Sequence, residues 1–174
     1  MKILDFPSLR QTYNYDCGTK AIQAALAYFG LDVREDKIIK MTNTTKHGAS
    51  IKSIIKVINL YQFKYKASQM RITDLKKYID KNYPVIISLQ AWTKKKRVNW
   101  KNNWSDGHYV VAIGYDKNKI YFADPSSIYK TYLTYKELED RWHDKDVNGK
   151  KYINYGIAVF GRKKYSSKKF VHMD

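Results

Sequence analysis

The chain contains one cysteine, three prolines and eight glycines in 174 residues. A single cysteine excludes an internal disulfide framework of the kind that stabilises small secreted domains. No apolar run approaches the roughly 18 residues that a membrane-spanning helix needs, and the N-terminus has no apolar segment resembling a signal peptide. We therefore expect a soluble protein of the cytoplasm.

Acidic residues are also scarce, because 16 Asp and Glu stand against 33 Lys and Arg, which gives a formal net charge of +17. Such an excess attracts nucleic acid, an anionic membrane surface or an acidic peptide. The chain is rich in Ile, Asn and Tyr as well as Lys, however, and AT-rich codons enrich all of these without selection for a partner. The charge by itself therefore leaves the partner open.

The sequence contains no signature of a metal site or of a phosphate-binding site. The four histidines lie far apart without the spacing of metal ligands, and no glycine-rich loop has the pattern that cradles phosphate. We expect no metal and no cofactor.

The residues that are present are those of a packed globular protein, with 44% hydrophobic and 15% aromatic residues in a length that fits one domain, 1–174. The predicted helices cover residues 17–29, 34–41, 50–60, 74–82 and 135–142, with Thr73 and Thr134 as caps. The predicted strands cover residues 63–67, 85–89, 109–115, 119–123, 132–133 and 155–160. This order predicts an α+β fold, with a helical half at about 1–83, an antiparallel sheet half at about 84–161 and a basic tail at 162–174.

The only cysteine, Cys17, stands at the start of a predicted helix. Polar, turn-prone residues 14–16 precede it, an alanine-rich helical pattern follows it, and Gly30 supplies the stop. Unpaired backbone N–H groups and the positive end of the helix dipole favour a thiolate at this position. A lone cysteine can also be an inert, buried residue. Gln11, six residues upstream, favours the reactive interpretation because its side-chain amide can donate to an oxyanion.

His108 and Asp124 stand at the two ends of a predicted hairpin, with Asp116 midway between them in the turn. A loop of three or five residues centred on Asp116 would place His108 directly opposite Asp124, with Cβ atoms about 5 Å apart on one face. The carboxylate would then orient the imidazole. A two-residue turn at 117–118 would instead place the two side chains on opposite faces.

Together, Cys17, His108, Asp124 and Gln11 supply the nucleophile, general base, orienting carboxylate and oxyanion donor of an acyl-transfer site. Their motifs resemble those of the C39 family of papain-like cysteine peptidases, whose best-known members cut leader peptides after a double glycine. The motifs are Gln11-x5-Cys17-Gly18, Gly107-His108-Tyr109-Val110-Val111, Gly114-Tyr115-Asp116 and Asp124-Pro125, and the resemblance covers about residues 5–161.

The resemblance implies a papain-like fold with the active site between the helical half and the sheet half. On that likeness Cys17 attacks, His108 is the general base, Asp124 orients it, and Gln11 donates to the oxyanion beside the Cys17 backbone N–H. Many family members are domains of ABC exporters, whereas this chain carries no membrane helix or ATPase, so the resemblance is to freestanding members. The chain has no Gly-Gly pair, so a double-glycine substrate would be a peptide or protein acting in trans.

Tryptophans are concentrated around the long loop before His108. We consider Trp92, Trp104 and Trp142 as candidate substrate contacts, because large aromatic side chains often line peptide clefts. The alternative is that they pack the loop and a helix end onto the sheet, while the basic run at 94–97 is simply solvated. Both interpretations are open for Trp92 and Trp104, and the position of Trp142 at a helix end favours packing.

The favoured hypothesis is a cysteine peptidase that hydrolyses a peptide bond through a thioester acyl-enzyme, with amidase or transacylase chemistry as variants of the same step. One alternative is a basic module that binds RNA, DNA or another polyanion through residues 94–97 and the tail lysines. Another is a papain-like domain that binds peptides without hydrolysing them.

Overall fold

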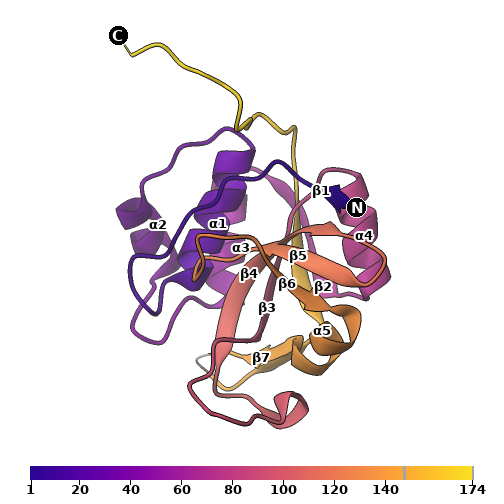
Figure 1. Cartoon of the computed structure of the whole chain (residues 1–174). Helices are drawn as coiled ribbons and strands as arrows, with labels where there is room; N and C mark the ends of the chain where they lie inside the picture. The colour runs from indigo at the N-terminus through magenta and orange to yellow at the C-terminus, as the bar shows by residue number, and fades with distance from the viewer. Residues whose placement is uncertain (147, 174) are drawn as a thin grey trace.

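The computed structural model of the chain describes residues 1–146 and 148–173 and shows a group of helices packed against an antiparallel sheet (Figure 1). The helices are α1 (Cys17–Tyr28), α2 (Glu35–Thr42), α3 (Ile51–Leu60), α4 (Ile72–Asp80), α5 (Tyr135–Arg141) and the short 3-10 helix η1 (Trp100–Asn102). The strands are β1 (Lys2–Ile3), β2 (Lys64–Gln69), β3 (Val85–Gln90), β4 (Gly107–Tyr115), β5 (Lys119–Ala123), β6 (Thr131–Thr134), β7 (His143–Lys145), β8 (Lys151–Ile153) and β9 (Tyr155–Phe160). The predicted α+β class is confirmed.

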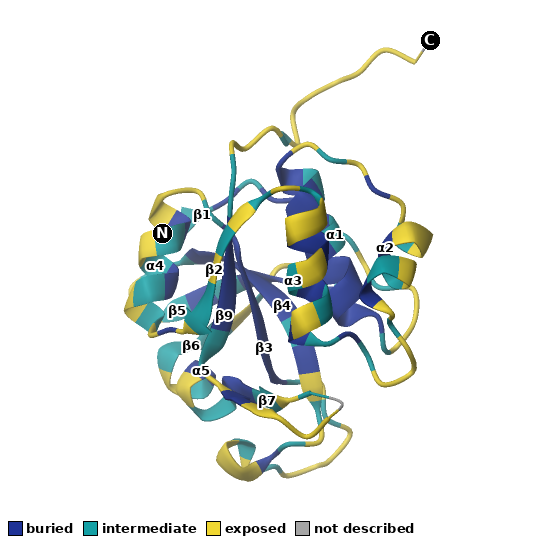
Figure 2. Cartoon of the chain, turned by 180° about the vertical axis from the view of Figure 1, so that it is seen from behind, coloured by how far each residue is buried: buried dark blue, intermediate teal, exposed yellow. Residues whose placement is uncertain are grey.

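Seven strands form one antiparallel sheet in the order β2-β9-β3-β4-β5-β6, and β1 pairs with β4 outside this path. Strand β3 lies in the middle of the sheet and is buried along its whole length, which explains its nearly continuous apolar sequence. Figure 2 shows this buried centre between α1, α2 and α3 on one side and α4 and α5 on the other. Strands β7 and β8 form a separate hairpin.

Helix α1 is the central helix of the fold, because ten of its twelve residues are buried. Its alanines leave room for close contact with the sheet. The helix ends where the sequence predicts, since Gly30 has a φ of +87° and the next amide, Leu31 N–H, donates back to the Leu26 carbonyl over 3.0 Å. A left-handed glycine with such a bond is a standard helix C-terminus.

The predicted elements agree with the observed ones within a few residues, with one wrong cap. Helix α4 begins after Arg71, whose backbone N–H donates to Asp74 over 2.9 Å, so Thr73 lies inside the helix and does not cap it. Thr134 does cap α5, because its hydroxyl accepts from the Glu137 N–H. The short elements β1, η1 and the β7–β8 hairpin were not predicted, because two or three polar residues carry no detectable hydrophobic period.

The C-terminal segment returns across the helical side before it projects away from the body (Figure 1). The backbone N–H groups of Lys164 and Tyr165 both donate to the Tyr28 carbonyl at 3.1 Å. The side chain of Asp5 accepts from Ser167 N–H at 3.1 Å. The first part of the basic tail is therefore attached to the end of α1, and residues 168–173 extend away from the body.

Candidate active site

Cys17 is the first residue of α1, and the first turn of that helix lies against β4. A Cβ on Gly18 would come within 3.0 Å of the Tyr109 ring and 3.3 Å of Ala49. Glycine at position 18 therefore lets the start of the helix approach the strand closely. Cys17 itself is only 9% exposed, and its thiol sits where the unpaired N–H groups of the helix start are concentrated.

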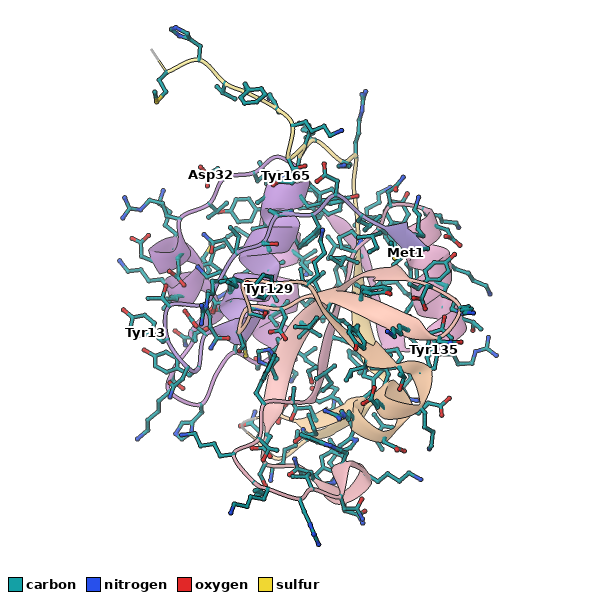
Figure 3. The ribbon with its side chains drawn as sticks, in the orientation of Figure 1. Met1, Tyr13, Asp32, Tyr129, Tyr135 and Tyr165 are labelled. Carbon is teal, nitrogen blue, oxygen red and sulfur yellow. The ribbon has the colours of Figure 1, made fainter. Side chains whose placement is uncertain are left out.

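The loop that leads into Cys17 is held by Asp16, which is fully buried. Its carboxyl group accepts from the backbone N–H groups of Thr12 and Tyr13, both at 3.2 Å. Burial, followed by a hydrogen bond with Glu35, raises the pKa of Asp16. Figure 3 shows Tyr13 at the outer edge of the helical side, so the loop has a solvent-facing surface and a buried, hydrogen-bonded one.

Glu35, the first residue of α2, links this loop to α1. Its carboxylate lies 2.8 Å from the Lys20 ammonium and accepts from the Thr12 hydroxyl at 2.7 Å. Burial opposes the charge on Glu35, but hydrogen bonds from Lys20 and Thr12 lower its pKa. The Glu35 carboxylate therefore contacts Thr12 and Asp16 of the loop before Cys17 and Lys20 of α1. These contacts hold the loop against the start of the helix.

His108 is the second residue of β4 and is 6% exposed. Its Nε2 lies 2.7 Å from Asp124 Oδ1, which leaves Nδ1 as the ring nitrogen for the Cys17 sulfur. Burial would lower the pKa of His108, but the hydrogen bond with Asp124 and the interaction with Cys17 outweigh it and raise the pKa to about 9. This environment favours an imidazolium at neutral pH, which puts a positive charge beside the Cys17 sulfur.

Each of the two oxygen atoms of the Asp124 carboxylate accepts two hydrogen bonds. Oδ1 also accepts from Ser126 N–H at 2.8 Å, while Oδ2 accepts from the Trp92 indole at 3.1 Å and the Thr131 hydroxyl at 3.2 Å. Burial would raise the pKa of Asp124, but the hydrogen bond and charge of His108, with the other donors, lower it. The carboxylate is therefore both ionised and fixed in orientation.

Of the hairpin turns that the sequence leaves open, the structure has the shorter one. Asp116 N–H donates to the Lys119 carbonyl at 3.1 Å, so the turn has two residues, 117 and 118. That turn alone would place His108 and Asp124 on opposite faces. A β-bulge at Ile113 shifts the register by one residue, so that Ala123 pairs with Val111 and Asp124 comes opposite Val110. His108 and Asp124 then share one face as diagonal neighbours.

The bulge coincides with the attachment of the N-terminal strand. The carbonyl of Ile113 accepts from Leu4 N–H at 2.8 Å, and β1 pairs with Gly114 and Tyr115 where β3 no longer does. A Cβ on Gly114 would lie 2.7 Å from the Lys2 carbonyl oxygen, so β1 can approach only because residue 114 is glycine. The N-terminal segment thus helps to set the register on which the His108 and Asp124 pair depends.

Gln11 is attached to the segment that follows Asp124. Its backbone N–H donates to the Pro125 carbonyl at 2.9 Å, and its Oε1 accepts from the Ser126 hydroxyl at 3.0 Å. One N–H of its side-chain amide donates to the Tyr13 carbonyl at 2.7 Å, which leaves the second N–H for another acceptor. Gln11 therefore joins the loop before Cys17 to the turn after Asp124.

A cleft of about 510 Å³ opens beside Cys17. Tyr15, Ser88, Tyr109 and Tyr152 are among the residues that line it, so its wall is aromatic with hydroxyl groups. The cleft lies between the start of α1 and the residues of β3, β4 and β7. This is the position, between the helical half and the sheet half, that the sequence analysis assigns to an active site.

The three candidate tryptophans lie in different environments. Trp92 is 58% exposed and donates to Asp124, so it covers the carboxylate from the solvent side. Trp104 lines the cleft and packs on the His143 ring at 4.5 Å between centroids. Trp142 is 2% exposed and donates its indole N–H to the Tyr155 carbonyl at 2.9 Å, so it packs in the core.

Asp144 is the residue of the cleft that sequence analysis missed. Its carboxylate accepts from Ser88 at 3.0 Å and Gln90 at 3.1 Å, and burial raises its pKa. A Cβ on Gly107 would lie 2.5 Å from Asp144 Oδ1, so only glycine fits before His108. The signal in the sequence was the run of aromatic and ionisable residues 141–144 at the end of a predicted helix. The spacing of that run did not indicate that β7 lines the cleft.

Two features are absent from residues 1–146 and 148–173. None of the helices there combines the length with the apolar character that crossing a membrane requires. No three histidine, cysteine or acidic side chains of these residues are grouped so that they would hold a metal ion.

The fold and the motifs can be compared with known proteins. The model of the peptidase C39 family matches residues 5–147. A putative C39-like peptidase from Bacillus anthracis has a TM-score of 0.70 at 18% identity, over 94% of this chain and 98% of that chain. The peptidase domain of Streptococcus ComA, described as a bi-functional ABC transporter in a quorum sensing pathway, has a TM-score of 0.66 at 20% identity, over 92% of this chain and 98% of that chain.

A third structure is a double glycine motif protease from an AMS/PCAT transporter in complex with the leader peptide. It has a TM-score of 0.66 at 17% identity, over 91% of this chain and 93% of that chain. The comparison with curated proteins finds no match. Identities of 17 to 20% show a shared fold and do not transfer a substrate. Because the family model covers most of its length, the chain belongs to the peptidase C39 family.

Proposed function

We propose that this chain is a cysteine peptidase in which Cys17 is the nucleophile and His108 the general acid and base. The observation that carries the proposal is the 2.7 Å bond from His108 to the buried Asp124, with the same imidazole interacting with a cysteine at a helix start. A structural cysteine needs neither an imidazole partner nor an oriented one. The arrangement supports nucleophilic catalysis through an activated thiolate.

In the proposed reaction, the Cys17 thiolate attacks the carbonyl carbon of the scissile bond and forms a tetrahedral intermediate. The oxyanion accepts from the Cys17 backbone N–H and from the second amide N–H of Gln11. The His108 imidazolium gives its proton to the leaving amine as the C–N bond breaks, which leaves a thioester. Neutral His108 then takes a proton from water, the hydroxide displaces the sulfur, and the thiolate is regenerated beside the imidazolium.

The roles assigned to the partners follow from their bonds. Asp124 keeps the imidazole in one orientation and stabilises its charge, while Trp92 and Thr131 hold Asp124. Ser126 connects Asp124 to Gln11, because its N–H donates to the one and its hydroxyl to the other. The general base and the proposed oxyanion donor are thus oriented by the same turn.

Labelling with a peptide chloromethyl ketone tests the proposal. We expect rapid alkylation of Cys17 at neutral pH, none in Cys17→Ala, and a rate reduced by about 10² or more in His108→Ala. His143→Ala is the matched control, since His143 is similarly buried at 7%, but its ring nitrogen bonds to the Asn103 carbonyl and not to a carboxylate. Equal rates in the wild type and His108→Ala would contradict the proposal.

We also propose that the bond cleaved follows small residues, with Gly-Gly of a leader peptide as the leading candidate. The similarity to a protease described with a double glycine motif supports this proposal. The measurement is a comparison of peptide N-termini produced in cells by the wild type and by Cys17→Ala. New termini after glycine are expected, and new termini with no preference for small residues would refute this specificity.

A further inference from the structure

A second groove adjoins the cleft beside Cys17. It has a volume of about 560 Å³ and lies between α2, the loop that follows it and α3. The groove and the cleft share His47 and Gly48 as lining residues, so a chain that leaves the cleft across this turn enters the groove. Gly48 has a φ of +87°, and a Cβ there would meet only the Tyr15 carbonyl oxygen at 3.6 Å, so the passage is open.

The groove is basic without any internal counter-charge. Lys40 of α2 and Lys52 and Lys56 of α3 line it and are exposed, and no acidic side chain of the described residues lines it. None of the three ammonium groups forms an ion pair within residues 1–146 and 148–173. Figure 2 shows that the faces of α2 and α3 away from the sheet are exposed, so these charges are available to a ligand.

The acidic residues of the adjoining cleft are already used inside the protein. Asp144 accepts from Ser88, Gln90 and the Lys145 N–H. Asp146 accepts from backbone N–H groups at positions 148 and 150, both at 2.9 Å. Lys46 and Lys145 also line the cleft, and the described chain gives neither ammonium group an ion pair. The cleft therefore carries both lysines and carboxylates, whereas the groove presents only positively charged side chains to a substrate.

We propose that the groove lined by Lys40, Lys52 and Lys56 binds an acidic segment of the peptide whose scissile bond lies at Cys17. This inference rests on the proposed function for the position of that bond. An extended peptide advances about 3.3 Å per residue, so a segment beside the scissile bond reaches the groove within a few residues. The groove has no Phe, Tyr or Trp among its lining residues, and its one ring is the His47 imidazole at the junction with the cleft, whereas single-stranded nucleic acid is held by several aromatic rings that stack on successive bases. Acidic side chains are therefore the anions that fit.

Equilibrium binding to the Cys17→Ala protein tests the inference without requiring turnover. The probes are fluorescein-labelled peptides that contain Ala-Gly-Gly-Ala next to a block of four glutamates, placed before it in one peptide and after it in another. Matched peptides carry glutamines instead. We expect one glutamate peptide to bind about tenfold more tightly than its glutamine match at low salt, with the difference lost at high salt.

The groove is tested by the triple variant Lys40→Ala, Lys52→Ala, Lys56→Ala. We expect it to lose most of the preference for glutamate, and the corresponding triple substitution to Arg to retain it. The matched control is Lys94→Ala, Lys95→Ala, Lys96→Ala, which removes the same charge from the exposed loop before η1. A control that loses the preference to the same extent would overturn the inference, because net charge and not the groove would then be responsible.

Two other outcomes also overturn the inference: equal binding of glutamate and glutamine peptides, and tighter binding of an oligothymidine of equal charge that the groove variant abolishes. The chloromethyl ketone labelling of the wild type separates this inference from the proposed function. If labelling succeeds and the peptides do not discriminate, only the groove assignment fails. If labelling fails while the glutamate preference depends on the groove lysines, the peptidase proposal fails and the chain is an acidic-peptide binder.

Discussion

Asp124 is the residue on which most of the polar contacts at the site converge. Four donors from β4, the loop after β3, its own turn and β6 meet its two oxygen atoms. An orienting carboxylate has two separable effects, because its position fixes the imidazole and its charge stabilises the imidazolium. Two substitutions at this position can distinguish them.

Asp124→Asn keeps an acceptor for His108 but removes the charge, and it puts an amide N–H near the Trp92 indole N–H. We expect the pKa of His108 to fall from about 9, so that the imidazolium is lost at a lower pH than in the wild type. Activity should fall by roughly tenfold for Asn and roughly 10²-fold for Asp124→Ala, which also loses orientation.

The measurements are an NMR titration of His108 and kcat/KM on a peptide substrate. Asp140→Asn is the control, since that carboxylate is bonded only to surface lysines. An unchanged His108 titration in both Asp124 variants would show that the carboxylate does not act through the imidazole.

At the scale of elements, helix α2 acts on the loop that carries Gln11. Its first residue, Glu35, is the counter-ion of the buried Lys20 and also holds Thr12. The helix therefore contributes to the site through the position of a loop and contacts none of the proposed reacting groups. Removal of its carboxylate should affect both stability and catalysis, for different reasons.

Glu35→Gln leaves the Lys20 ammonium, whose side chain is 8% exposed, without its counter-ion. We expect the free energy of unfolding to fall by about 2 kcal/mol, and kcat to fall severalfold while the His108 titration stays unchanged. Denaturant unfolding and single-turnover kinetics measure the two effects. Addition of Lys20→Met to Glu35→Gln should restore part of the stability, because the buried charge is then absent.

The control for this element is Asp36→Asn, since Asp36 pairs with Arg34 at the surface, where both side chains are more than half exposed. Its substitution should change stability by less than about 0.5 kcal/mol. A Glu35→Gln protein as stable and as active as the Asp36→Asn protein would show that the Glu35 cluster does not position the loop.

At the scale of the whole molecule, the helical side and the sheet side each supply part of the site. Cys17 and Gln11 come from the helix start and the segment before it, while His108 comes from β4 and Asp124 directly follows β5. The lysines that contribute to the net charge of +17 differ in their partners. Some of them pair with acidic side chains, and those of the α2–α3 groove do not. The same layout places the basic groove next to the cleft without any contact between the groove lysines and the proposed reacting groups.

The start and end of α1, the positions of the main strands and the choice of four candidate site residues could all be read from the sequence. These features are local, because a helix start, an apolar run or a glycine stop is decided by neighbours in the chain. The family motifs are likewise short and contiguous. For this reason the α+β order and the place of Cys17 at a helix start followed from sequence alone.

How the candidate residues meet depends on contacts between segments that are distant in the sequence. The bulge at Ile113 coincides with the attachment of the N-terminal strand, which lies more than a hundred residues away in sequence, and it reverses the consequence of the two-residue turn. The placement of Asp144 in the cleft and of Glu35 over the loop before Cys17 also depends on distant packing. Such contacts follow from burial and from the satisfaction of polar groups across the whole fold, and no local pattern encodes them.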